Sequence, residues 1–449
     1  GSTFRGSPLM GTGAFNIKAR ELRDANIAVV VGASRLHGQG SIGKIGDTLE
    51  FAFDGRRLAQ LGPRVTGNLT VSAKFVGLLT HPRVAFEAKS DALSFDQRFS
   101  AGILEARGSW SNDDDPRIEL KTTGQRISMG DIKLDSLTVD VGGSLALHTI
   151  ALNAVGTGGV ITTQWEGGVR KKNVVADISD RHWVGHIKTL TSRGTLPFEL
   201  LSPAPLEAGP GYFALGETSA DLAGGRLSLK PLRRENGRIT SSGGSTGVPA
   251  LPILALAGVA PQPGSDLKLR GAWAIKATPR LNGTLSVARE SGDLIPPPPS
   301  TTRVGLEELN LDLRFVDDTA NAKLIVQGSQ FGIGKIDVTA VPAEGDGPLS
   351  ATARLAGNVK LDLANLHLLD NWIGTAALVD GVVRAQLGLA GTLAAPVVTG
   401  TLEGDRIRFE VPQQGIALKN GRLRAELTDQ ALVVQEFSIS GPTGTLAAN

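Results

Sequence analysis

The stretch Leu309-Asn310-Leu311-Asp312-Leu313-Arg314-Phe315 alternates apolar and polar side chains without interruption. Successive side chains of a β-strand point to opposite faces, so this run places its leucines and phenylalanine on one face and its charges on the other. Runs of the same kind recur between glycine-bearing turns along all 449 residues. The sequence therefore predicts an all-β protein whose sheet has one apolar face and one polar face.

The apolar positions of these runs are the candidate functional residues. They recur at a spacing of two within short predicted strands and would all point to the apolar face. In chain order they are Phe51, Phe53, Leu69, Val71, Val84, Phe86, Leu227, Leu229, Leu267, Leu269, Leu311, Leu313, Phe315, Ile407, Phe409 and Val411. Between Leu134 and Leu137 the alternation slips by one position, which requires a β-bulge or a break, and we predict a break near Ser136.

Composition favours stacked strands over a globule. Glycine accounts for 57 residues and aromatic residues for only 4% of the chain, so turns are many and bulky core-filling side chains are few. The 46 basic and 44 acidic residues are interleaved, which indicates a solvated face and no basic patch for nucleic acid. The absence of cysteine excludes disulfides and thiolate chemistry.

Two short segments depart from the strand pattern. Asp362 can cap a helix in which apolar residues recur at spacings of three and four, which predicts a short amphipathic helix over about 362–373. A second short helix is expected after Pro249. The longest apolar stretch, from Val248 to Ala260, is shorter than the roughly 20 residues that a membrane-spanning helix needs.

Proline-rich segments mark local interruptions of the strand pattern and not domain boundaries. They lie near 203–210, 261–266 and 296–301 and predict seams within one continuous β-groove that occupies residues 1–449. The opening Gly1-Ser2 is typical of an expression vector, so we expect the chain to be a fragment of a longer protein.

An internal repeat links distant parts of the chain. The unit Gly-x9-Gly-x-Leu-x2-Pro starts at Gly67 and again, 314 positions later, at Gly381. A shorter match relates the Pro-x3-Gly-Thr-Leu segment from Pro279 to the one from Pro396. These repeats indicate that one supersecondary unit recurs.

Several segments resemble the TamB family, the inner-membrane-anchored periplasmic subunits of the bacterial translocation and assembly module. The similar segments are Gly388–Gly400 (GLAGTLAAPVVTG), Val411–Ile416 (VPQQGI), Trp183–Ile187 (WVGHI), Leu200–Pro205 (LLSPAP), Gly271–Trp273 (GAW) and Gly292–Pro297 (GDLIPP). The AsmA-like group of bridge-like lipid carriers has motifs of the same kind. The resemblance implies an elongated, U-shaped (taco-like) β-groove with an apolar interior. It also implies a periplasmic location between the inner and outer membranes of a diderm bacterium.

Two functions and one fold without a ligand remain open at this point. The groove could carry phospholipid acyl chains between the membranes, or the sheet could be a scaffold for insertion of outer-membrane β-barrels and autotransporters together with a TamA-type barrel protein. In the second case nascent outer-membrane proteins would be partners. The same alternation also fits a closed β-solenoid or sandwich with no ligand.

Motifs for catalysis are weak. Gly38-Gln39-Gly40-Ser41-Ile42-Gly43 matches the dinucleotide fingerprint, but a strand pattern follows it where a helix is needed. His182 and His186 have the spacing of helical metal ligands within a strand-like stretch, and Asp113-Asp114-Asp115 is typical of a solvated turn. We therefore expect no metal, no cofactor and no enzymatic activity.

Overall fold

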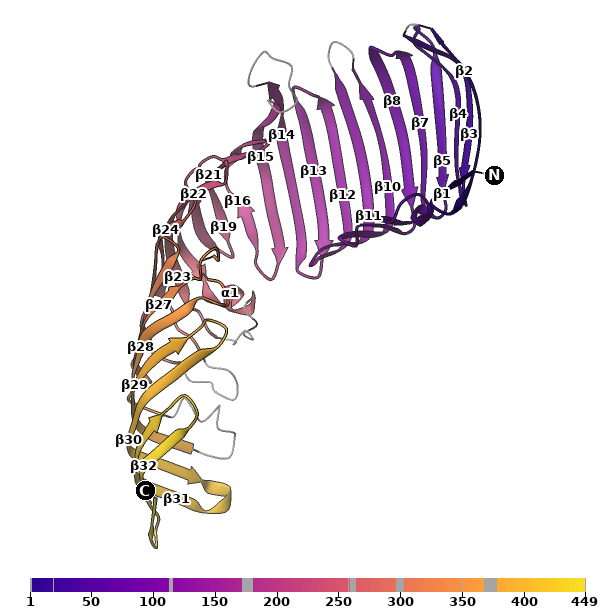
Figure 1. Ribbon diagram of the computed structural model, residues 1–449. Helices are drawn as coiled ribbons and strands as arrows, with labels where there is room; N and C mark the ends of the chain where they lie inside the picture. The colour runs from indigo at the N-terminus through magenta and orange to yellow at the C-terminus, as the bar shows by residue number, and fades with distance from the viewer. Residues whose placement is uncertain are drawn as a thin grey trace. The chain divides into compact units, whose positions relative to one another are not determined.

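The computed structural model describes residues 2–18, 20–112, 116–171, 181–256, 258, 264–295, 303–347, 349–366 and 378–448. Most of them belong to β-strands that pair with antiparallel neighbours (Figure 1). The prediction of an all-β protein is therefore confirmed. The chain divides into two compact units, Gly1–Leu215 and Gly216–Asn449.

The first unit contains long hairpins followed by shorter strands. Figure 1 shows β7, β8 and β10 to β15 side by side in one broad sheet. The strands are β1 (Ser2–Phe4), β2 (Ser7–Lys18), β3 (Glu21–Val31), β4 (Ser34–Ile42), β5 (Thr48–Gly55), β6 (Val65–Gly67), β7 (Leu69–Leu78), β8 (His81–Ser90), β9 (Leu93–Phe95), β10 (Phe99–Ser111), β11 (Arg117–Met129), β12 (Ile132–Ser144), β13 (His148–Gly156), β14 (Gly159–Lys171), β15 (Arg181–Gly194), β16 (Phe198–Leu200), β17 (Ala204–Gly209) and β18 (Tyr212–Leu215). A 3₁₀ turn, η1 (Leu58–Gln60), follows β5.

The second unit begins with short strands, continues with long antiparallel strands and contains one helix. Its strands are β19 (Thr218–Leu222), β20 (Gly225–Leu229), β21 (Leu232–Glu235), β22 (Arg238–Pro249), β23 (Lys268–Ala277), β24 (Leu281–Ser291), β25 (Leu306–Val316), β26 (Thr319–Gly328), β27 (Gly332–Val341), β28 (Arg354–Leu363), β29 (Leu378–Gly391), β30 (Pro396–Val411), β31 (Ile416–Leu427), β32 (Leu432–Ser440) and β33 (Thr445–Ala448). The helix α1 (Ala250–Leu256) follows β22, as predicted, and a 3₁₀ turn, η4 (Pro412–Gln414), follows β30.

The helix predicted over 362–373 is wrong at its start. Asp362 and Leu363 are the last residues of β28, where Leu363 pairs with Gly332 of β27 and with Val383 of β29. Ladder pairing on both sides fixes this stretch as strand, and Leu361 and Leu363 keep the spacing of two. Residues 364–366 are described and are not helical, and the remaining part of the predicted helix, 367–373, lies outside the described residues, as do 296–301 and the first half of the 261–266 seam.

The break predicted near Ser136 is also wrong, because a β-bulge absorbs the slip in the alternation instead. Strand β12 runs through without interruption, and its register against β13 shifts between Leu134 and Ser136. The extra residue, Asp135, forms a β-bulge that returns Leu137 to the same face as Leu134.

The repeated sequence units have the same backbone geometry. Gly77 pairs with Pro82 across the β7–β8 turn, and Gly391 pairs with Pro396 across the β29–β30 turn. Gly283 and Gly400, matched in the shorter repeat, have φ values of 141° and 142°. A Cβ on either would lie 2.1 Å from a carbonyl oxygen of the neighbouring strand, so only glycine fits.

The chain exposes more surface than a compact protein does. Its accessible surface is 26774 Å², against about 16,000 Å² for a globular protein of this mass. Among the described residues no large side chain is completely buried. This openness argues against the closed sandwich, in which two apolar faces would cover one another.

Candidate functional site

The predicted apolar residues of the first unit lie on one face of its sheet. Phe51 pairs with Ala73, and Ala73 pairs with Phe86 on the next strand. Two residues further along β5, Phe53 pairs with Val71. The row that contains Phe51 continues across successive strands through Gly108, Leu120, Val141, Ile150, Trp165, Ile187 and Ala204.

The second unit has an equivalent apolar face. Leu311 pairs with Val287 on one side and with Leu324 on the other, and Leu313 pairs with Leu285 and Ala322. The row through Leu311 runs from Ala220 and Leu227 to Ser245, Gly271, Val287, Leu324, Ile336, Val359, Leu387, Gly400 and Leu427. These rows, with the apolar rows beside them, are called the apolar face of each unit below.

Placement of the remaining candidates depends on two local features. Leu267 precedes β23 and is only 2% exposed, because it packs in a cluster with Ala250 of α1 and Leu306. Ile407 and Phe409 follow a register shift in β30 at Arg406, whose φ is +53°. This bulge places Ile407 beside Gly404 and Gly421 on the apolar face.

Aromatic rings lie against glycines of neighbouring strands on this face. A methyl group on Gly38 would lie 2.7 Å from Cε1 of Phe51, and one on Gly108 would lie 2.9 Å from Cε1 of Phe86. In the second unit a methyl group on Gly243 would lie 2.4 Å from Cζ2 of Trp273. The rings therefore cover bare backbone and form a smooth apolar surface. The alternation of apolar and polar residues did not show that rings lie against these glycines. The available signal was a glycine at a position where alternation expects an apolar side chain.

Three indole groups bond to polar side chains on the apolar face. The indole N–H of Trp165 donates to Oγ1 of Thr163 at 2.7 Å. Similarly, Trp183 donates to Nε2 of His148 at 3.0 Å, and Trp273 donates to Oγ of Ser241 at 2.9 Å. Because His148 also has its Nδ1 3.0 Å from the carbonyl oxygen of Ser144, it is the Nδ1–H tautomer. Satisfied polar groups cost little when an apolar ligand covers them.

The opposite face carries charges in cross-strand pairs, as the interleaved composition predicts. Directly paired partners form ion pairs, including Glu50 with Lys74 at 3.0 Å and Lys121 with Asp140 at 3.5 Å. A hollow of about 730 Å³ on the first unit belongs to this polar face. Its walls include side chains that alternate with the apolar row, among them Glu50, Lys74 and Lys121. These exposed pairs contribute little stability each but keep the face hydrated.

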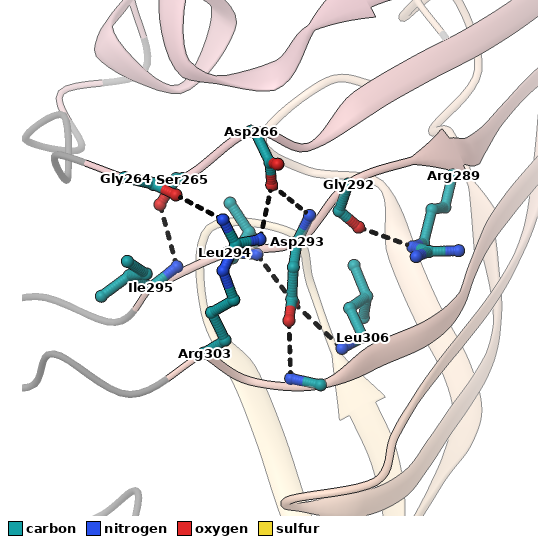
Figure 2. A network of polar contacts seen from close by, with 11 residues as sticks. Gly264, Ser265, Asp266, Arg289, Gly292, Asp293, Leu294, Ile295, Arg303 and Leu306 are labelled. Carbon is teal, nitrogen blue, oxygen red and sulfur yellow. Dashed lines mark hydrogen bonds and ion pairs between the residues drawn. The ribbon is translucent and has the colours of Figure 1, made fainter.

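A polar network fixes the segments beside α1 (Figure 2). The Asp266 carboxylate accepts hydrogen bonds from Nη1 of Arg303 at 2.7 Å and from the Asp293 N–H at 2.9 Å. Asp293 in turn accepts from the N–H groups of Gly305 and Leu306. The Arg303 guanidinium holds the pKa of Asp266 below its ordinary value, and Asp266 raises the pKa of Arg303.

This network supports a cover over one end of the apolar face. Leu254 of α1 and Leu294 pack against the buried cluster that contains Leu267 and Leu306. Leu269 and Leu309, which belong to the apolar face, pack against the same cluster. The helix therefore covers this part of the face in the second unit.

The glycine-rich and histidine motifs lie mainly in strands, whereas Asp113-Asp114-Asp115 lies outside the described residues. The Gly38–Gly43 stretch lies mainly in β4, which pairs with β3 and β5, so no phosphate-binding helix follows it. His182 and His186 lie in strand β15. Within the described residues no group of three or more metal-ligating side chains occurs. Across that same part of the chain, no helix has the length and apolar character needed to cross a membrane.

Fold and face together define a one-sided antiparallel β-sheet protein with an apolar face that crosses many strands. A family model described as the TamB N-terminal domain matches residues 2–189 and 264–403. The chain therefore belongs to the TamB family. The unmatched residues between these ranges include the short strands β16 to β21. A search of curated proteins gives no match.

Proposed function

We propose that this chain carries phospholipid acyl chains along its apolar face, as a periplasmic segment of an inner-membrane-anchored protein that bridges the two membranes of a diderm bacterium. The supporting observation is the continuity of the apolar rows, beside which indole groups bond the Thr163, His148 and Ser241 side chains. Transport of this kind requires no covalent chemistry, so the protein would not be an enzyme. It would need no cofactor.

The energetic reason for a groove is the cost of exposing lipid to water. Covering each methylene is worth about 0.8 kcal/mol, so an acyl pair of about 30 methylenes would need roughly 25 kcal/mol to enter water. Successive strands of the apolar face offer similar hydrocarbon contacts at spacings of about 4.8 Å. A bound chain would slide between nearly equivalent positions, and an outside source or sink would set the direction.

The test compares adjacent residues on opposite faces of β25. Leu313 lies between Leu285 and Ala322 on the apolar face, whereas Asp312 lies between Ser286 and Lys323 on the polar face. Leu313→Arg should stop lipid transfer between donor and acceptor vesicles, because acyl chains would have to pass a buried guanidinium. Asp312→Arg introduces the same group on the other face and should leave transfer unchanged. Thermal melting of both variants tests whether they fold.

Photo-crosslinking identifies the cargo directly. A photoreactive residue at Leu311, Leu313 or Phe409 should label phospholipid in cells, and the same residue at Asp312 or Arg408 should not. Equal transfer by the two arginine variants, or equal lipid labelling on both faces, would remove the basis for the proposal. Labelling of outer-membrane protein precursors without lipid would instead support the scaffold that acts with a TamA-type partner.

A further inference from the structure

Three successive strand pairs of the second unit, spanning β29 to β32, shift register at neighbouring positions. The β29–β30 register shifts between Asp380 and Val382, and the β30–β31 register shifts between Gly404 and Ile407. The β31–β32 register shifts between Lys419 and Arg422. Because each shift leaves residues out of the ladder, the regular pairing is interrupted in all three strand pairs.

Two residues that are not glycine adopt left-handed conformations at this interruption. Arg406 has a φ of +53° and Asn420 a φ of +55°. Such conformations are uncommon for an arginine and occur often at ligand sites, where the surrounding structure maintains them. Here they lie on adjacent strands and at the same level.

A hollow of about 640 Å³ lies at this interruption on the polar face. We call it the arginine crease; it is lined by Arg384, Arg406 and Arg422, with Asp405, Asn420 and Ser438. Arg384 lies 3.9 Å from Asp405 and 3.7 Å from Asp362 and is thus paired. Within the part of the chain that the structure describes, neither Arg406 nor Arg422 forms an ion pair. Arg408 and Arg424, on the same two strands, each form an ion pair.

We propose that the arginine crease binds a phosphate-bearing anion. Guanidinium groups present parallel N–H donors that match phosphate oxygens, and the crease holds three of them, of which only Arg384 is paired with carboxylates among the described residues. The crease is on the face opposite Ile407 and Phe409, so its ligand is separate from an acyl chain on the apolar face. The inference does not depend on lipid transfer.

The experiment uses the full chain and two double variants with the same change in net charge. Arg406→Asn with Arg422→Gln removes the unpaired guanidinium groups, and asparagine tolerates the left-handed backbone. Arg408→Gln with Arg424→Gln is the control, because these arginines lie on the same strands but pair with Glu410 and Glu436. Circular dichroism and thermal melting establish that both variants are folded.

Two probes distinguish the sources of the phosphate group. Calorimetric titration with pyrophosphate at low salt reports a free anion, and flotation with phosphatidylglycerol or phosphatidylcholine vesicles reports a headgroup at a membrane surface. We expect at least one anionic probe to bind the wild type, to bind the crease variant at least tenfold more weakly, and to bind the control within twofold. Binding of neither probe, or equal weakening in both variants, would overturn the proposal.

Discussion

A methyl group at Gly38 tests whether aromatic rings lie against glycines of the sheet. Gly38 pairs with Phe51, and an added Cβ would lie 2.7 Å and 2.8 Å from two ring carbons, with no backbone atom among the three nearest contacts. Gly38→Ala must therefore displace the ring, which also makes an edge-on contact with Phe75 at 5.7 Å between centroids. Overpacking of this kind typically costs about 1–3 kcal/mol.

The control is Gly142→Ala in β12, where an added Cβ meets no atom within 4 Å. Replacing glycine by alanine restricts the unfolded chain and stabilises by about 0.4–1 kcal/mol when the site accepts it. Both variants share this gain, so their unfolding free energies should differ by about 1–3 kcal/mol, with Gly38→Ala lower.

Urea denaturation followed by circular dichroism measures the difference. Adding Phe51→Leu should reduce the cost of Gly38→Ala, because a shorter side chain leaves room for the methyl group, and a double-mutant cycle isolates this coupling. If Gly38→Ala stabilises the protein as much as Gly142→Ala does, the ring does not cover Gly38 and the smooth apolar surface is incorrect.

Two further predictions concern polar groups at the apolar face and beside α1. Trp273→Phe removes the donor to Ser241 and should lower the unfolding free energy by about 1–2 kcal/mol; adding Ser241→Ala should restore much of it in urea denaturation, and no recovery would contradict a role for this bond. Because Arg303 lowers the folded-state pKa of Asp266, their pairing stabilises above the ordinary carboxyl value of 3.8 and is lost as the pH falls through the lower folded-state pKa. The melting-temperature gap between wild type and Asp266→Asn should therefore be full at pH 7 and close at strongly acidic pH; a gap of equal size at pH 7 and pH 2 would exclude the pairing as its cause.

Alternation predicted the sheet and its apolar face because the two-residue period is a local property of the chain. Leu311, Leu313 and Phe315 share a face for that reason. The helix predicted from Asp362 failed because leucine spacings of two, three and four overlap in this segment. Pairing of Leu363 with strands on both sides decided in favour of β28, and such non-local pairing has no local signature.

Bulges were the second limit of the sequence interpretation. Leu402 and Ile407 are separated by an odd number of positions, yet both belong to the apolar face because Arg406 is a bulge residue. The phase difference indicates that a bulge or break is needed, but it does not show which residue adopts the left-handed conformation. The arginine crease arises at such a position, so it could not be predicted from alternation.

Both units cover exposed glycine backbone on the apolar face with a tryptophan ring from the adjacent strand. A single sheet layer leaves glycine backbone accessible on its apolar face, and a wide ring from the adjacent strand can cover it. Trp183 lies over Gly167 in the first unit, and Trp273 lies over Gly243 in the second. In both cases the indole N–H also bonds a polar side chain on that face. Because one side chain covers the backbone and satisfies the polar atom, the face remains smooth and apolar without a second layer.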